Sequence, residues 1–171
     1  MLICTAKRSL GFVLAVGLSV PTIAHSADVL TGDVLLSISG DITKTNIEGK
    51  FVLDRDMLTG LPATSFETST IWTDGVHTFT GVSLVDLAAE IGVEEGQFMA
   101  IAINDYTVKI PSTDAVENGP IIAYQMDGKE MSVRDKGPLW VVYPYDSNAN
   151  YRTEVIYSRS IWQLDRLDVV K

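Results

Sequence analysis

Side chains of the kind that grip a flat, polar ring are concentrated between residues 104 and 163. The tyrosines, three arginines and two of the three tryptophans lie in this interval. Aromatic faces stack on a ring, Arg donates to ring oxygens and nitrogens, and a carboxylate accepts from an exocyclic amine. The set therefore predicts a site for a planar heterocycle. Its candidate residues are Asp105, Tyr106, Arg134, Lys136, Trp140, Arg159, Ser160 and Trp162, together with Trp72 from an earlier turn.

Each of these residues also has a purely structural interpretation. Aromatic side chains on strands mainly fill a β core, and Arg and Lys pair with a surplus of acids. Arg134–Trp140 places three charges before a Gly-Pro turn, and Gly and Pro are turn formers first. The functional interpretation is that Lys136 and backbone N–H groups at this turn hold an anion or a polar ring edge. Ser158–Trp162 similarly places two hydroxyls and a guanidinium before a strand.

Composition excludes several classes of chemistry. The 171 residues carry 13 Lys and Arg against 22 Asp and Glu, a formal charge of −9. This argues against nucleic-acid binding, which needs clustered cations. Cys4 is the single cysteine, and the histidines are His25 and His77. Because Cys4 and His25 fall in an expected leader segment, the mature chain would have neither a thiolate nor a multi-histidine metal site. No triad pattern surrounds His77, so we predict no catalytic residue and no metal.

The first 27 residues are typical of a secretory signal. Lys7 and Arg8 precede an apolar run over residues 10–20, which Pro21 ends and small residues follow. Eleven apolar residues are well short of the ~20 that a transmembrane helix needs. We expect cleavage near residues 24–27 and a periplasmic protein, with an uncleaved membrane anchor as the alternative.

Residues 28–171 show no internal repeat or linker, and their number suits one domain. The clearest helix follows Ser83, an N-cap with Asp86 three residues on, and ends at Gly92. A second, short helix is capped by Asp54. Many short strands accompany these two helices, which predicts an α+β or mostly β domain. The strands are expected at residues 34–38, 66–71, 78–82, 98–103, 106–110, 121–125, 130–133, 139–143 and 161–169.

Four segments, in this order, resemble the oxidoreductase molybdopterin-binding domain, which has the sulfite-oxidase fold. They are residues 79–87 (FTGVSLVDL), 104–111 (NDYTVKIP), 136–144 (KGPLWVVYP) and 160–164 (SIWQL). The resemblance covers about residues 66–169. It implies a mixed α+β domain with few helices and a barrel-like β core that holds a pterin cofactor.

The chain departs from this family's pattern where the cofactor would bind. Catalytic members bind molybdenum through a cysteine, whereas the equivalent stretch here, residues 67–72, has hydroxyls and no thiol. A hydroxyl is a poor substitute for a soft thiolate ligand. Trp140 stands where the family has a basic residue, and Ile161 precedes Trp162 where the family has Lys before Trp. A phosphate-bearing cofactor would lose partners, while a bare ring would gain a stacking face.

With these departures, the chain is similar to a short, secreted, cysteine-less branch of the family. Some proteins of that branch bind a pterin in the periplasm and relay its status to a membrane receptor that controls cyclic dinucleotide turnover. The resemblance implies that Trp140 and Trp162 stack on the pterin, with Trp72 next. Asp105, at a turn between two strands, is the expected acceptor for the ring's amine, with capping of that turn as its alternative role. Arg134 and Arg159 are the expected donors to the ring, supported by Ser160, and Tyr106 and Lys136 complete the expected site.

Three functions follow from the sequence. The leading hypothesis is a non-catalytic pterin sensor whose partner is the periplasmic domain of a membrane signalling protein. The second is a molybdopterin-dependent oxidoreductase that lacks the usual cysteine ligand. The third is a degenerate interaction domain with an empty pocket. Molybdenum bound to the protein would support the second, a pterin without metal the first, and neither the third.

Overall fold

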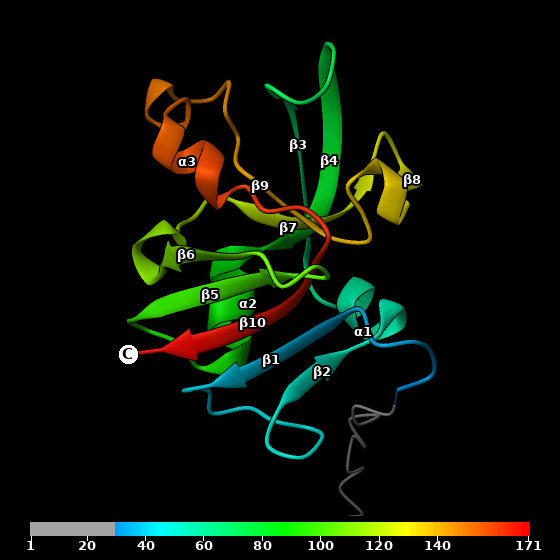
Figure 1. The fold of residues 1–171 in the computed structure, drawn as a ribbon, viewed down its shortest axis with the longest axis vertical. Helices are drawn as coiled ribbons and strands as arrows, with labels where there is room; N and C mark the ends of the chain where they lie inside the picture. The colour runs from blue at the N-terminus through cyan, green and yellow to red at the C-terminus, as the bar shows by residue number, and fades with distance from the viewer. Residues whose placement is uncertain (1–29) are drawn as a thin grey trace, which may run out of the picture.

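Two open β-sheets dominate the fold in the computed structural model, which describes residues 30–171 (Figure 1). The first sheet has the order β2-β1-β10-β5-β6, and the second has the order β3-β4-β7-β8, with β9 also paired to β7. The strands are β1 (Leu36–Gly40), β2 (Phe51–Leu53), β3 (Ala63–Ser69), β4 (Val76–Ser83), β5 (Gln97–Ala102), β6 (Thr107–Pro111), β7 (Ile121–Met126), β8 (Lys129–Glu130), β9 (Trp140–Val142) and β10 (Leu164–Val170).

The strand order places the first strand of the described residues beside the last. β1 pairs in parallel with β10, so that Ile38 lies opposite Leu167, while the other neighbours in the first sheet are antiparallel. In the second sheet β4 runs antiparallel to both β3 and β7. Backbone bonds from Val141 to Ile161 and from Leu164 to Leu139 join the two sheets where the chain enters β10.

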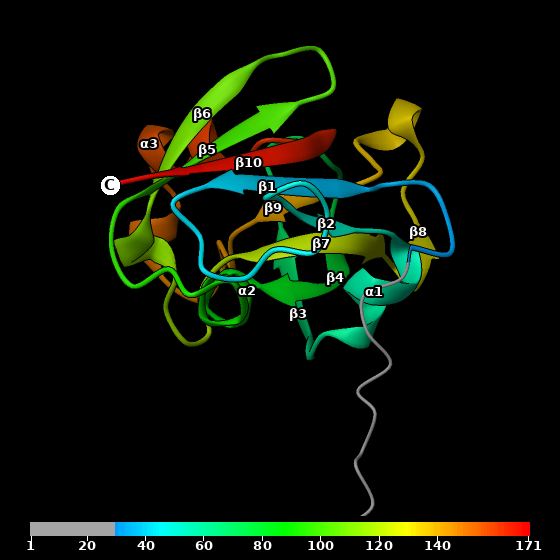
Figure 2. The ribbon, with the colours of Figure 1, turned by 90° about the horizontal axis from the view of Figure 1, so that it is seen from below.

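The hydrophobic core lies between the two sheets, which form separate layers (Figure 2). Strands alternate between buried and exposed positions, as in Leu36 and Ile38 of β1 and Phe98 and Ala100 of β5. The first four positions of β7 and all three of β9 are buried, which indicates that this part of the second sheet is covered on both faces. This core holds the cavity-forming segments described below in place.

The two predicted helices are confirmed. α2 (Leu84–Ile91) begins after Ser83, whose hydroxyl accepts from the Asp86 amide at 3.0 Å, and ends at Gly92 in the left-handed region. Its buried residues, Leu84, Leu87, Ala88 and Ile91, recur at spacings of three and four and so lie on one face. α1 (Arg55–Gly60) begins after Asp54, which accepts from the Met57 amide at 2.9 Å. Local capping chemistry thus places both helices.

The structure corrects the expected barrel. The domain is mostly β with few helices, as predicted, but its sheets do not close, because each ends in edge strands: β2 and β6 in one, β3 and β8 in the other. The strand expected at residues 130–133 is also wrong. β8 stops at Glu130, and residues Val133–Asp135 form the 3₁₀ helix η2 instead.

A third helix was not predicted. α3 (Glu154–Arg159) lies just before the final strand, which starts at Leu164 rather than residue 161. Thr153 caps it by accepting from the Ile156 amide at 3.3 Å. Thr followed by Glu is the signal that marks this start, because a hydroxyl caps the first turn and an acid favours its positive end. Tertiary contacts stabilise this helix, since six residues are too few to be helical alone.

The expected signal peptide, residues 1–27, lies outside the described residues. The domain boundary at residue 28 also remains a prediction. Within residues 30–171, no helix is both long and apolar enough to cross a membrane.

Candidate functional site

A cavity of about 460 Å³ opens between the loop at residues 70–75, the β5–β6 hairpin and the segment from α3 to β10. Its volume lies in the range of small-molecule sites. Every residue that lines it is uncharged, and four of them are aromatic. The lining residues are Trp72, Ala102, Asn104, Tyr106, Tyr157, Ser158, Ser160, Ile161, Trp162 and Gln163.

Trp72 is the centre of an aromatic cluster at the inner wall of this cavity. Its ring lies edge-to-face with Trp140, Tyr145, Tyr157 and Trp162, at centroid distances between 5.7 and 6.2 Å. Edge-to-face packing of this kind adds to burial energy and fixes ring orientation. The loop that carries Trp72 comes from the β3–β4 connection, so the second sheet contributes one wall and the first sheet another.

Trp162 and Trp140 come from paired segments but occupy different environments. The two residues form an isolated β-bridge, and the Trp162 side of it lines the cavity with 38% of its surface exposed. Trp140 is completely buried, and its indole N–H donates to the Ser160 carbonyl at 3.1 Å. Trp140 therefore packs against Trp72 in the core and does not line the cavity.

The two cationic candidates on the 134–136 turn lie outside the cavity lining. Arg134 is in η2 and is exposed. Lys136 ends η2 in the left-handed region, and its ammonium lies 5.6 Å from the centre of the Trp140 ring. That distance is within cation–π range, so Lys136 packs on Trp140 and does not line the cavity.

Asp105 and Tyr106 point to different surroundings although they are neighbours. The Asp105 side chain is 81% exposed and pairs with Arg166 at 2.7 Å. This pair and Asp165 raise the pKa of the Arg166 guanidinium. Tyr106 lines the cavity, and its backbone amide donates to the Asn104 side chain at 3.2 Å. The hairpin thus presents an aromatic ring and an amide to the cavity, and holds its carboxylate outside.

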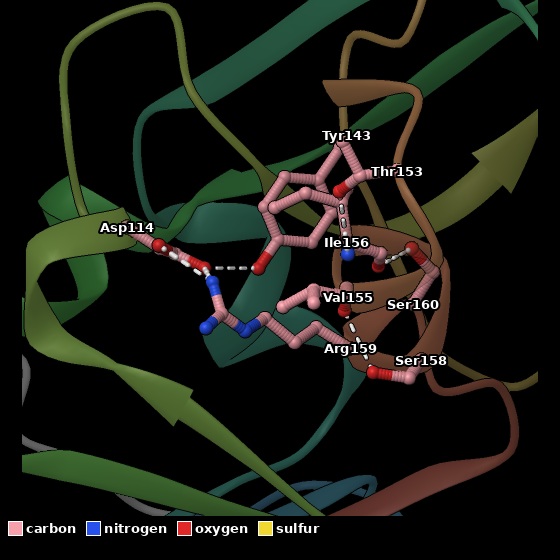
Figure 3. A network of polar contacts seen from close by, with 8 residues as sticks. All are labelled: Asp114, Tyr143, Thr153, Val155, Ile156, Ser158, Arg159 and Ser160. Carbon is pink, nitrogen blue, oxygen red and sulfur yellow. Dashed lines mark hydrogen bonds and ion pairs between the residues drawn. The ribbon is translucent and has the colours of Figure 1, made fainter. Parts of the chain in front are cut away.

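Arg159 is not among the residues that line the cavity. Its side chain points toward Asp114 in the 3₁₀ helix η1 (Ser112–Asp114), as Figure 3 shows. Its guanidinium donates to both carboxylate oxygens of Asp114, at 2.9 and 3.1 Å. The hydroxyl of Tyr143 donates to the same carboxylate at 2.7 Å. Burial, and then the bond to Asp114, raises the pKa of this phenol. These three residues form a single polar network beside the cavity.

Ser160 is buried and connects α3 to the aromatic cluster. Its hydroxyl accepts from the Tyr145 hydroxyl at 2.6 Å and donates to the Ile156 carbonyl at 2.9 Å. Burial raises the pKa of the Tyr145 phenol. The hydroxyl of Ser160 is therefore already satisfied, and it orients the end of α3.

The structure brings together four of the nine residues singled out in the sequence. Trp72, Tyr106, Ser160 and Trp162 line the cavity. The remaining five, Asp105, Arg134, Lys136, Trp140 and Arg159, do not. Whether any of them binds a pterin stays a prediction.

Several lining residues were missed as candidates. The most consequential are Asn104, Tyr157, Ser158 and Gln163. Tyr157 and Ser158 belong to the helix that was not predicted, which is why their direction could not be foreseen. Gln163 has a φ of 54°, and its side-chain nitrogen donates to the Val133 carbonyl at 2.7 Å. The amide oxygen of Gln163 can therefore accept a hydrogen bond from a ligand. The side-chain oxygen of Asn104 accepts from the Tyr106 amide, so the side-chain nitrogen of Asn104 can donate.

The lining residues do not fit a phosphate-bearing, molybdenum-carrying pterin. No lysine or arginine stands among them to hold a phosphate. Thr68, in the stretch where a ligand cysteine is expected, is buried and accepts from the Asp146 amide at 3.1 Å. In the part of the chain that the structure describes, no three His, Cys, Asp or Glu side chains form a potential metal site. The arrangement suits stacking and neutral hydrogen bonding instead.

Comparison with known proteins identifies the family. A family model described as the oxidoreductase molybdopterin-binding domain matches residues 61–150, from β3 through the 145–150 loop. No curated protein matches the chain. The matched residues hold the Trp72 loop, the β5–β6 hairpin and Asp114, and they make up more than half of the sequence. The chain therefore belongs to the oxidoreductase molybdopterin-binding domain family.

Proposed function

We propose that this chain is a non-catalytic binding protein for a small pterin. The observation that carries the proposal is the uncharged, aromatic-lined cavity within a domain of a pterin-cofactor family. A pterin is flat on both faces and has an edge of alternating donors and acceptors. Trp72 and Trp162 offer stacking surfaces, while Asn104 and Gln163 offer neutral amide groups for the edge.

Because the lining residues are uncharged, the cavity favours pterins that carry no phosphate. A phosphate group buried without a cation would lose its hydration without compensation. Arg159 and Arg166, which flank the lining segment Ser160–Gln163 in the sequence, both pair with carboxylates. The proposed ligand is therefore a pterin without a phosphate, and molybdopterin fits less well.

The proposal includes a location and a partner. The leader-like residues 1–27 support export to the periplasm. The similarity to the cysteine-less branch supports a role in which the pterin-bound protein contacts the periplasmic domain of a membrane receptor for cyclic dinucleotide turnover. N-terminal sequencing of the protein recovered from periplasm tests the location, and an intact Met1 in the membrane fraction would overturn it.

Calorimetric titration with pterin tests the binding function. Trp162→Ala removes a ring from the cavity, and we expect at least tenfold weaker binding, corresponding to about 1.4 kcal/mol. Phe66→Ala is a matched control, because Phe66 is a half-buried ring on β3 that does not line the cavity. The proposal fails if the wild-type protein binds no pterin at millimolar concentration. If both variants bind pterin equally well, the binding site lies outside this cavity.

Family membership favours one second candidate, a molybdopterin-dependent oxidoreductase. Metal analysis of protein purified from a molybdenum-replete host separates the two functions. Stoichiometric molybdenum would establish the oxidoreductase, whereas a co-purified pterin without metal would support the binding protein.

A further inference from the structure

We infer that Arg159 and Asp114 are positioning residues for the cavity: their ion pair fixes α3, and α3 in turn sets one cavity wall. The inference rests on the proposed pterin-binding function. It replaces the direct contact between Arg159 and the ligand that the sequence led us to expect. Arg159 acts through the helix that carries it, without touching the ligand.

The first step is the dependence of the cavity on α3. Tyr157 and Ser158 are in this helix and Ser160 follows it, and all three line the cavity. Tyr157 also packs edge-to-face on Trp72 at 5.7 Å. A rotation or displacement of α3 would therefore alter the wall and the stacking surface together.

The second step is that α3 has little stability of its own. It has six residues, and Ile156 is its buried residue. An isolated helix of this length does not persist in water. Contacts from outside the helix must hold it in place, and the structure shows where they are.

The third step is the geometry of the Asp114 contact. One nitrogen of the Arg159 guanidinium donates to both oxygens of the Asp114 carboxylate, and the Tyr143 hydroxyl donates to one of them (Figure 3). The side chains of Arg159 and Asp114 are 23% and 15% exposed, so water screens this pair less than a surface pair. The network joins α3 to η1, immediately after β6, and to the chain just after β9. Three separate parts of the fold thus converge on one carboxylate.

A direct role and a positioning role predict different results for Asp114→Asn. If Arg159 donated to the ligand, weakening its ion pair would leave binding unchanged or improve it. If the pair positions α3, Asp114→Asn and Arg159→Met should weaken pterin binding by a similar factor. A fall in the competent fraction to about one tenth weakens the apparent affinity about tenfold. The double variant should be no worse than either single variant, because both remove the same contact.

The experiment is calorimetric titration of these three variants with pterin and with 2-aminopteridine, which lacks the ring oxygen that a guanidinium would bind. We expect the same relative loss for both compounds, and partial recovery in Arg159→Lys. Lys44→Met is the matched control, because Lys44 pairs with Glu90 away from the cavity; it should bind like the wild type. A loss confined to pterin, or unchanged binding in Asp114→Asn, would overturn the inference.

Hydrogen exchange separates failure of this inference from failure of the proposed function. Amides of residues 156–160 should exchange faster in Asp114→Asn and Arg159→Met than in the wild type, with or without ligand. If the wild type binds no pterin but this acceleration is seen, the proposed function fails and the role of the ion pair in fixing α3 stands. Unchanged exchange in both variants would overturn that role whatever the protein binds.

Discussion

The two buried tyrosines after β9 provide a quantitative test of the polar network. Tyr143→Phe removes a hydroxyl that donates to the Asp114 carboxylate at 2.7 Å, and Tyr145→Phe removes one that donates to the neutral Ser160 hydroxyl at 2.6 Å. Both rings are almost completely buried, so the two changes remove the same atom from similar surroundings. The difference between them isolates the charge of the acceptor.

The expected magnitudes follow from the acceptors. A hydrogen bond to a charged group contributes about 1.5–3 kcal/mol, and one between neutral groups contributes about 0.5–1.5 kcal/mol. Tyr143→Phe should therefore lower the free energy of unfolding by more than Tyr145→Phe does. Asp114 keeps its bonds from Arg159 in Tyr143→Phe, which places the expected loss toward the lower end of the first range.

Urea unfolding followed by far-UV circular dichroism measures both losses. Equal m-values across the wild type and the two variants would show that the same transition is compared. Tyr143→Phe in an Asp114→Asn background serves as the control, because the charge that strengthens the bond is then absent. A loss for Tyr145→Phe that equals or exceeds that for Tyr143→Phe would refute the reasoning.

Three further predictions concern pH and backbone packing. The Asp127 side chain, 2.7 Å from His77, raises the pKa of that imidazole above 6.5. The pair therefore stabilises the fold fully below pH 6.5, and this stabilisation is lost as the pH rises through the raised pKa. In His77→Ala this decline in the free energy of unfolding should be absent. Hydrogen bonds from the Met57 amide and others lower the pKa of Asp54 to about 2, so stability should fall as pH drops from 3.8 toward 2, and acid titration of Asp54→Ala should lack this step. Gly81→Ala would place a Cβ 2.1 Å from a backbone carbonyl of β7 and should lower the melting temperature sharply, whereas Gly60→Ala meets nothing within 4 Å and should be nearly neutral.

Local signals in the sequence were sufficient for the two capped helices. Ser83 and Asp54 each accept an amide three residues ahead, and such contacts depend on neighbouring residues alone. Sequence pattern also located β1, in which Leu36 and Ile38 alternate with Ser37 and Ser39 and are buried. The family could be recognised from short segments of fixed spacing, and three of them, residues 79–87, 104–111 and 136–144, lie within the residues that the family model matches.

Sheet closure and α3 were decided by tertiary contacts. Whether two sheets close depends on how their edge strands meet, and β2, β6, β3 and β8 are far apart in sequence. α3 has a cap but too few residues to be helical alone, so it depends on tertiary contacts. One of these is the bond from Arg159 to Asp114, two residues that lie 45 positions apart in the sequence.

The sequence by itself determined which kinds of side chain are available for binding, and the tertiary structure decided which of them face the cavity. Composition selected aromatic rings and basic groups, and Trp72, Tyr106 and Trp162 do line the cavity. The direction of a side chain depends on partners that are distant in the chain. Arg159 is drawn to Asp114, and Asp105 to Arg166, because opposite charges that folding brings within 3 Å attract more strongly than either is attracted to a neutral cavity.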